Sequence, residues 1–129
     1  MSNLVVSNIS DGTTTVGTGY VVNGSAKAWV NFNGTGTIAI RDSMNVSSLT
    51  DNATGNHSVT YSSSMANVNY QISGAAAGGT IGILYSRQAS PTRATTYINF
   101  FTLYQSDLSG NGGYADMDSV DQSTHGDLA

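Results

Sequence analysis

Residues 26–40 read AKAWVNFNGTGTIAI, and this stretch decides the predicted fold. Side chains that alternate between two faces with a period of two, as the first eight do, are typical of a β-strand and not of a helix. The sequence NGTG at 33–36 tolerates the positive φ angles that a tight reversal requires. We therefore expect two strands joined by a glycine turn. The first has an inner face of Ala26, Ala28, Val30 and Phe32 and an outer face of Lys27, Trp29, Asn31 and Asn33.

Trp29 is the only tryptophan, and it belongs to the outer face of this strand. One interpretation is that it covers a second apolar layer or a contact between subunits. The other is that its ring is a stacking platform for a sugar. We favour the first interpretation, because a lone aromatic side chain more often packs than binds.

The composition of the 129 residues favours one all-β domain, alone or with a short N-terminal attachment segment. Only 9% of the residues are charged, against an average of about 25%. Glutamate is absent, strong helix formers are few, and Thr, Ser, Asn, Gly and Val are frequent. The 15 glycines indicate many turns and argue against helices of any length.

The formal net charge is −4, with only four Lys and Arg residues to meet phosphates, so we expect no nucleic-acid partner. The chain has no cysteine, which excludes disulfide bonds and thiolate metal sites. The first residues, MSNL, do not resemble a signal peptide, and no segment is long and apolar enough for a membrane span. We therefore expect no membrane insertion.

Alternating apolar residues and turn signals predict about eight or nine short strands in an antiparallel β-sandwich or jelly roll. Before the first ribbon we expect a strand at 3–9, an extended arm or edge strand at 14–22 and a hairpin turn at 23–24. Residues 41–44 are expected to leave the ribbon, and Gly55 to supply the positive φ of a loop at 51–55. Further strands are expected at 45–50, 56–61, 68–72, 81–85, 94–104 and from 114 to 121, with loops at 75–79, 86–93 and 109–113.

The strand at 94–104 carries apolar side chains on both faces, with Ile98, Phe100 and Tyr104 on one and Phe101 and Leu103 on the other. Such a strand is central in its sheet or is covered by a neighbouring chain. The chain also has few charges. We therefore expect a homotrimer in which part of the core is intermolecular.

No residue pattern indicates catalysis. A Gly-x-Ser-x-Gly elbow and a phosphate-binding loop are absent, and a chain without glutamate gives little support to a glycosidase carboxylate pair. Asp116, Asp118 and Asp121 form an acidic cluster, with Asp127 beyond, but the spacing is not that of an EF-hand and a solvated edge strand explains it equally well. His57 is expected to be a partly buried aromatic on a hairpin face. We expect no enzyme activity, no cofactor and no metal.

Residues 22–36, VNGSAKAWVNFNGTG, resemble a motif from marine bacteriophage virion proteins, which are often described as tail-fibre or structural proteins. The resemblance continues through IRDS at 40–43, NVSSLTDN at 45–52, Gly55 and MANVNY at 65–70, and the closing HGD at 125–127 also fits. It covers residues 11–70 well and is weaker after that.

This resemblance implies a non-enzymatic β domain displayed on a virion, commonly at the tip of a longer fibre and trimeric. Almost nothing precedes the motif here, so we expect no fibre shaft. A capsid decoration or cement protein is therefore the alternative to a fibre knob. We expect an N-terminal attachment arm at 1–22, which contacts other capsid or tail proteins, and a sandwich domain at 23–129.

A virion surface module of this kind is expected to bind a host receptor or surface glycan. Tyrosines and loops rich in Asn, Ser and Thr suit hydroxyl-rich ligands. Loops at 75–79 and 86–93 fall where the resemblance fades and are expected to be variable surface loops. The candidate ligand-binding residues are Trp29, Tyr85, Arg87 and Arg93.

Overall fold

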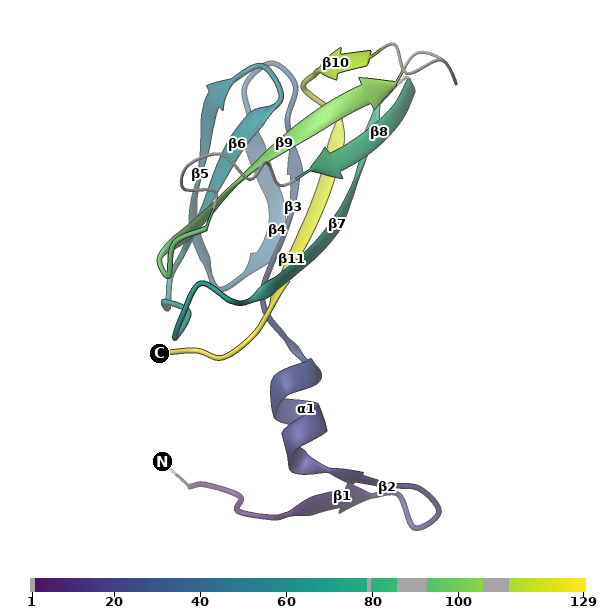
Figure 1. Cartoon of the computed structure of the whole chain (residues 1–129), viewed down its shortest axis with the longest axis vertical. Coiled ribbons are helices and arrows are strands. Elements are labelled where there is room, and N and C mark those ends of the chain that lie inside the picture. Colours follow the sequence, from purple (N-terminus) through teal and green to yellow (C-terminus); the bar gives the residue numbers. More distant parts are fainter. Residues whose placement is uncertain (1, 79, 86–92, 106–111) are drawn as a thin grey trace.

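The computed structural model describes residues 2–78, 80–85, 93–105 and 112–129. These residues form eleven strands and one short helix, and every strand pairing among them is antiparallel. The main sheet folds into two four-stranded layers, in the orders β4-β3-β11-β7 and β8-β9-β6-β5 (Figure 1). The expected all-β sandwich is therefore confirmed, with more strands than the eight or nine expected.

The two layers are joined by the pairing of β7 with β8, which aligns Ala77 with Ile81. The first layer consists of β4 (Ala39–Met44), β3 (Ala26–Asn33), β11 (Ser119–His125) and β7 (Gln71–Gly78). The second consists of β8 (Thr80–Tyr85), β9 (Tyr97–Gln105), β6 (Asn56–Tyr61) and β5 (Val46–Ala53). Outside these layers lie β10 (Gly112–Tyr114), which pairs with β9, a hairpin of β1 (Asn8–Ser10) and β2 (Thr15–Gly17), and helix α1 (Thr18–Gly24).

The core lies between the two layers, and on β3 it follows the predicted alternation. On β3 the buried side chains are Ala28, Val30 and Phe32, as expected from the sequence. The second layer contributes two further sets of alternating buried residues, and β11 a third. These are His57, Val59 and Tyr61 from β6, Ile98, Phe100 and Thr102 from β9, and Val120, Gln122 and Thr124 from β11.

The glycine turns that the sequence predicted are present. Gly36, in the reversal between β3 and β4, has a φ of +60°, and Gly55, between β5 and β6, has a φ of +63°. The side chain of Asn33 braces the first turn, because its Nδ2 donates to the carbonyl oxygen of Thr35 at 2.8 Å. Both turns place residues in the left-handed region, which glycine adopts without a Cβ penalty.

The expectations for residues 14–24 were confirmed only for the first few residues. Residues 15–17 form the short strand β2, but Thr18–Gly24 is a helix and not an arm that ends in a hairpin turn. Its start is fixed by a distant segment, since the Thr18 amide donates to the Ser7 carbonyl at 2.9 Å. At its other end Lys27 Nζ donates to the Val22 carbonyl. Neither contact is visible in local propensity, which disfavours a helix with two glycines and two valines.

Two other segments differ from expectation. Residues 75–78 belong to β7 and are not a loop, because β11 pairs along that strand from Ala77 to Gln71. Residues 41–44 do not leave the ribbon but complete β4, whose partner β3 aligns Ser43 with Val30. In both segments a neighbouring strand supplies the hydrogen bonds that the sequence alone could not assign.

Several boundaries also moved. Only residues 8–10 of the expected strand at 3–9 pair, β7 begins at Gln71 and not at 68, and the last strand runs from Ser119 to His125. Val46 and Leu49, the expected core residues of β5, are half-buried against the core. Residues 86–92 of the loop at 86–93, and most of the turn at 109–113, lie outside the described residues.

We call residues 2–25 the N-terminal stem, which comprises β1, β2 and α1. The stem projects from one end of the sandwich, near the C-terminus, while β10 lies at the opposite end (Figure 1). The expected boundary between residues 22 and 23 falls inside α1, and the division into an arm and a domain stays a prediction. In the described part of the chain no helix has the length and apolar character to cross a bilayer.

Candidate functional site

Trp29 lies in a row of side chains that crosses the outer face of the first layer. Strand β11 is flanked by β3 and β7, and the register aligns Ser123 with Trp29 on one side and with Ser73 on the other. Directly paired residues of antiparallel strands point to the same face, so these three side chains are neighbours. The expected outward position of Trp29 is confirmed, since Ala28 and Val30 on either side of it are buried while Trp29 is half-buried.

Hydrogen-bonding groups surround this row. Ser73 Oγ and Ser123 Oγ share a hydrogen bond of 2.8 Å, and His125 Nε2 lies 3.4 Å from Ser123 Oγ. In the next row Asn31 Nδ2 donates to Asp121 Oδ1 at 2.6 Å. Trp29 is therefore bordered by hydroxyl, imidazole, amide and carboxylate groups on one sheet surface.

A shallow groove of about 170 Å³ runs over this surface. Among the described residues its lining includes one aromatic ring and one carboxylate. An aromatic ring offers an apolar face for stacking, and the surrounding polar groups can donate and accept hydrogen bonds. This combination suits a ligand with an apolar face and a hydroxylated rim. The lining is Trp29, Val30, Ser73, Gly74, Asp121, Gln122 and Ser123.

The other predicted ligand-binding residues are not gathered around this groove in the described structure. Arg93 is half-buried beside β9, where it forms an isolated bridge with Ile98. Its guanidinium donates to the Tyr70 carbonyl at 3.0 Å and lies 5.7 Å from the centre of the Tyr70 ring. The side chain of Tyr85 and the whole of Arg87 lie outside the described residues. Ligand binding by these four residues stays a prediction.

The polar partners of Trp29 could not be identified from the sequence. Ser73 comes from a strand about 40 positions away, and Asp121 and Ser123 from a strand about 90 positions away, so no local pattern joins them to Trp29. One signal was present, because residues 119–125 read SVDQSTH and put Ser, Asp, Ser and His on one face of a strand.

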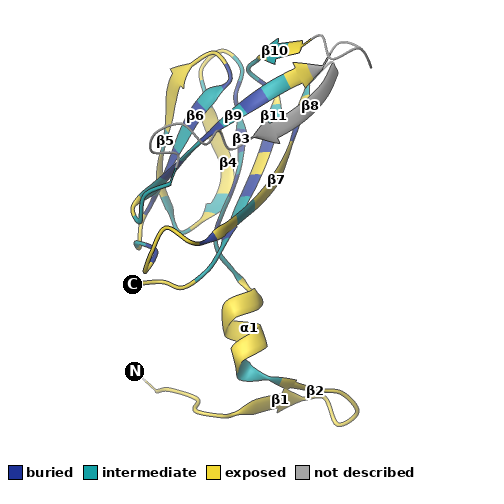
Figure 2. Ribbon diagram, viewed as in Figure 1, coloured by how far each residue is buried: buried dark blue, intermediate teal, exposed yellow. Residues whose placement is uncertain are grey.

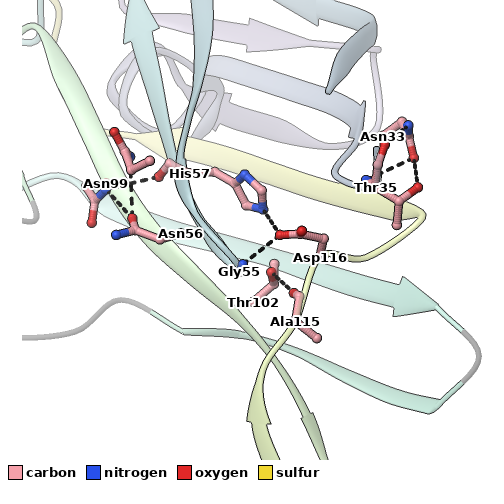
Figure 3. Close-up of polar contacts among 10 residues, drawn as sticks. Asn33, Thr35, Gly55, Asn56, His57, Asn99, Thr102, Ala115 and Asp116 are labelled. Carbon is pink, nitrogen blue, oxygen red and sulfur yellow. Dashed lines mark hydrogen bonds and ion pairs between the residues drawn. The ribbon is translucent and has the colours of Figure 1, made fainter. Parts of the chain in front are cut away.

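A second polar cluster lies at the end of the sandwich away from the stem (Figure 3). There His57 is fully buried, and its Nε2 lies 3.9 Å from Asp116 Oδ1. Asp116 Oδ1 accepts a hydrogen bond from the Gly55 amide at 2.6 Å, and Thr102 Oγ1 donates to the Ala115 carbonyl at 2.6 Å. These contacts hold the segment before β11 against the β5–β6 turn. We therefore interpret this cluster as a structural contact and not as a binding site.

The acidic residues of the expected cluster lie in three different environments. Asp116 faces His57 and Gly55, Asp121 pairs with Asn31 on the outer face, and Asp118 is exposed. Within the described ranges, no three His, Cys, Asp or Glu residues converge as the ligands of a metal ion would. Comparison of the chain with protein-family models, with curated proteins and with solved structures finds no match.

Proposed function

We propose that this chain is a non-enzymatic structural protein of a bacteriophage virion, a surface-displayed β module that attaches to a host receptor or glycan. The observation that carries the proposal is the outer face of β3, β11 and β7, where Trp29 lies among hydrogen-bonding side chains. The resemblance of residues 22–36 to a virion motif supports the assignment to a phage particle.

The chemistry of the groove favours binding over catalysis. Asp121 is the one carboxylate in its described lining, and its Oδ1 is engaged by Asn31. Hydrolysis of a glycosidic bond normally needs two carboxyl groups that flank the bond. A ring that stacks on Trp29 would instead meet the Ser123 and Ser73 hydroxyls and the Asp121 carboxylate. Such an array recognises hydroxyl groups without cleaving the ligand.

In this proposal the protein is a homotrimer of jelly-roll-like sandwiches on the virion. The stem points toward the particle and the sandwich toward the host. The free edge of β1 supports this orientation, because in the described structure β1 belongs to the stem and pairs only with β2, and such an edge can add to a neighbouring protein of the particle.

The test is glycan-array binding and adsorption to host cells by the purified chain. We expect binding that Trp29→Ala reduces at least tenfold, because the stacking surface is lost. Asp121→Asn should reduce binding with a smaller effect, since the amide keeps one acceptor oxygen. Tyr104→Ala, which removes an exposed aromatic ring from the other layer, is the matched control and should bind as the wild type does.

Undiminished binding by a folded Trp29→Ala protein would show that the outer face of β3, β11 and β7 does not bind the ligand. Release of reducing ends from host polysaccharide, lost on replacement of Asp121, would contradict the non-enzymatic assignment. Absence of the chain from purified phage particles, measured by mass spectrometry, would contradict the virion assignment. Each part of the proposal is thus tested by a separate measurement.

A capsid decoration or cement protein is the second candidate, and β1 favours it. In the described structure β1 pairs on one side only, where Ile9 aligns with Val16 of β2. A strand with a free edge can add to the sheet of a neighbouring shell protein. The copy number per particle separates the candidates, because a decoration protein covers the whole shell whereas a fibre knob occurs in few copies.

A further inference from the structure

Helix α1 has little internal stability. It has seven residues, none of them is buried, no side chain caps its first turn, and its end turns carry no charged residue. Isolated helices shorter than about 12 residues are marginal in water. The sequence TGYVVNG adds two glycines and two β-branched valines, which lower helix propensity further. Packing against another surface must therefore contribute to the stability of this helix.

Most residues of the stem are exposed (Figure 2), and several of them are large and apolar. Leu4 is 86% exposed, Val5 90% and Tyr20 80%. Exposed apolar residues gathered in one part of a molecule mark a surface that binds a partner. The full set is Leu4, Val5, Val6, Ile9, Val16, Tyr20, Val21 and Val22.

These residues form two different sides of α1. Successive helical residues rotate by about 100°, so Tyr20 and Val22 point about 160° apart. On the Tyr20 side a groove of about 540 Å³ is lined by Gly17, Gly19, Tyr20, Asn23 and Gly24. On the opposite side Val21 and Val22 line a groove of about 370 Å³ with the chain from Leu4 to Ile9. We call these the tyrosine side and the valine side.

The charge pattern indicates what covers these sides. Residues 1–24 carry one charged side chain, Asp11, which lies in the β1–β2 turn away from α1. Interfaces between copies of one chain are more apolar than interfaces with transient partners, and surfaces that select among different partners usually carry complementary charges. An uncharged helix with two apolar sides is therefore best matched by a second copy of itself.

We infer that α1 is the self-association surface of this protein, with the valine side of one copy packed on the tyrosine side of the next. Two different surfaces that meet head to tail form a closed ring when the rotation closes, and a trimer is such a ring. This inference rests on the homotrimer of the proposed function and specifies the surface that holds it.

The test measures the mass of the full-length chain by light scattering and native mass spectrometry. We expect a wild-type mass three times the 13.3 kDa of one chain. Val21→Gln/Val22→Gln breaks the valine side and Tyr20→Gln breaks the tyrosine side, and glutamine is a better helix former than any of the three. Each variant alone should be a monomer, because every interface needs both sides.

Mixing the two variants gives the sharper test. The intact tyrosine side of the double variant can pack on the intact valine side of Tyr20→Gln, so the mixture should form a one-to-one heterodimer and no trimer. An isologous contact, in which each side packs on its own copy, would instead give homodimers of the single variants. A mixture that stays monomeric would overturn the pairing of the two sides.

Ile40→Gln/Val68→Gln is the matched control, because these apolar side chains have exposures of 39% and 46% but lie outside the stem. The control should remain trimeric. If a stem variant aggregates, Leu4→Gln/Val5→Gln tests the valine side through residues that are almost fully exposed. Trimeric stem variants, or a monomeric wild type, would overturn the inference. Glycan binding through Trp29 and presence in virions are tested separately, so either could hold when the inference fails.

Discussion

Nε2 of His57 lies 3.9 Å from Oδ1 of Asp116, yet neither ring nitrogen of this fully buried side chain has a hydrogen-bond partner in the described structure. Phe32 and Phe100 surround the imidazole, with ring centres 5.2 Å and 6.2 Å away. Burial lowers the pKa of His57 below its ordinary value of 6.5, and the charges of Asp116 and then Asp51 oppose that shift. The fold therefore favours the neutral imidazole.

This arrangement predicts acid sensitivity. The unfolded chain binds a proton at His57 near pH 6.5, whereas the folded chain does so only at lower pH. The free energy of unfolding should therefore fall as the pH drops below about 6.5, and this fall should end where the pH reaches the lowered pKa of the folded state. Above about pH 6.5, His57 should contribute no pH dependence. Urea unfolding between pH 8 and pH 5 measures this loss.

His57→Phe is the variant that isolates the effect, because it keeps a ring between Phe32 and Phe100 but cannot titrate. Its stability should fall less than that of the wild type over the same pH range. Replacing His125, which lies on the outer face, should leave the contribution of His57 in place. Equal acid sensitivity of wild type and His57→Phe would show that the carboxylates alone account for it.

Gly55→Ala should destabilise the fold strongly. Gly55 has a φ of +63°, and a Cβ there would lie 2.5 Å from the Thr102 carbonyl oxygen and 2.7 Å from the Ala115 amide nitrogen. We expect a loss of about 3 kcal/mol or more, since backbone strain and a steric clash add. Gly36→Ala has a similar φ of +60° but open space around it, so it should cost only about 1 kcal/mol. Similar unfolding midpoints for the two variants would contradict this account.

Asn45 links β4 to β5 at the corner between the layers, and it is the one non-glycine residue with positive φ among those described. Its Nδ2 donates to the Lys27 and Ser63 carbonyls at 3.0 Å and 3.1 Å, and its Oδ1 accepts from the Ser63 amide at 2.6 Å. Asn45→Ala should lose about 2–3 kcal/mol through lost hydrogen bonds and strain. Asn45→Gly removes only the bonds, so its thermal midpoint should lie between those of wild type and Asn45→Ala.

Tyr61→Phe should cost about 1 kcal/mol. The Tyr61 hydroxyl lies 2.9 Å from Thr124 Oγ1 and connects the second layer to the first inside the core. The loss is moderate because Gln122 Nε2 still donates to Thr124 Oγ1 at 2.7 Å. Tyr104→Phe, at an exposed position, should change the urea midpoint little. A stability loss at position 104 equal to that at 61 would contradict a role for the buried bond.

The outer face could be predicted only in part. The alternation around Trp29 correctly separated it from the buried Ala28 and Val30. Which side chains stand beside Trp29 depends on β11 lying between β3 and β7, and strand order is a long-range property. Arg93, a second residue predicted to bind a ligand, packs on Tyr70 in the fold.

The sequence by itself determined which side chains of β3 face inward, because a period of two is a property of the extended backbone and needs no partner. It also determined the turns at Gly36 and Gly55, where positive φ requires glycine. Only the tertiary structure decided that residues 75–78 form a strand and Thr18–Gly24 a helix. Their local propensities point elsewhere, and the hydrogen bonds that hold them come from β11, Ser7 and Lys27, which are adjacent only after folding.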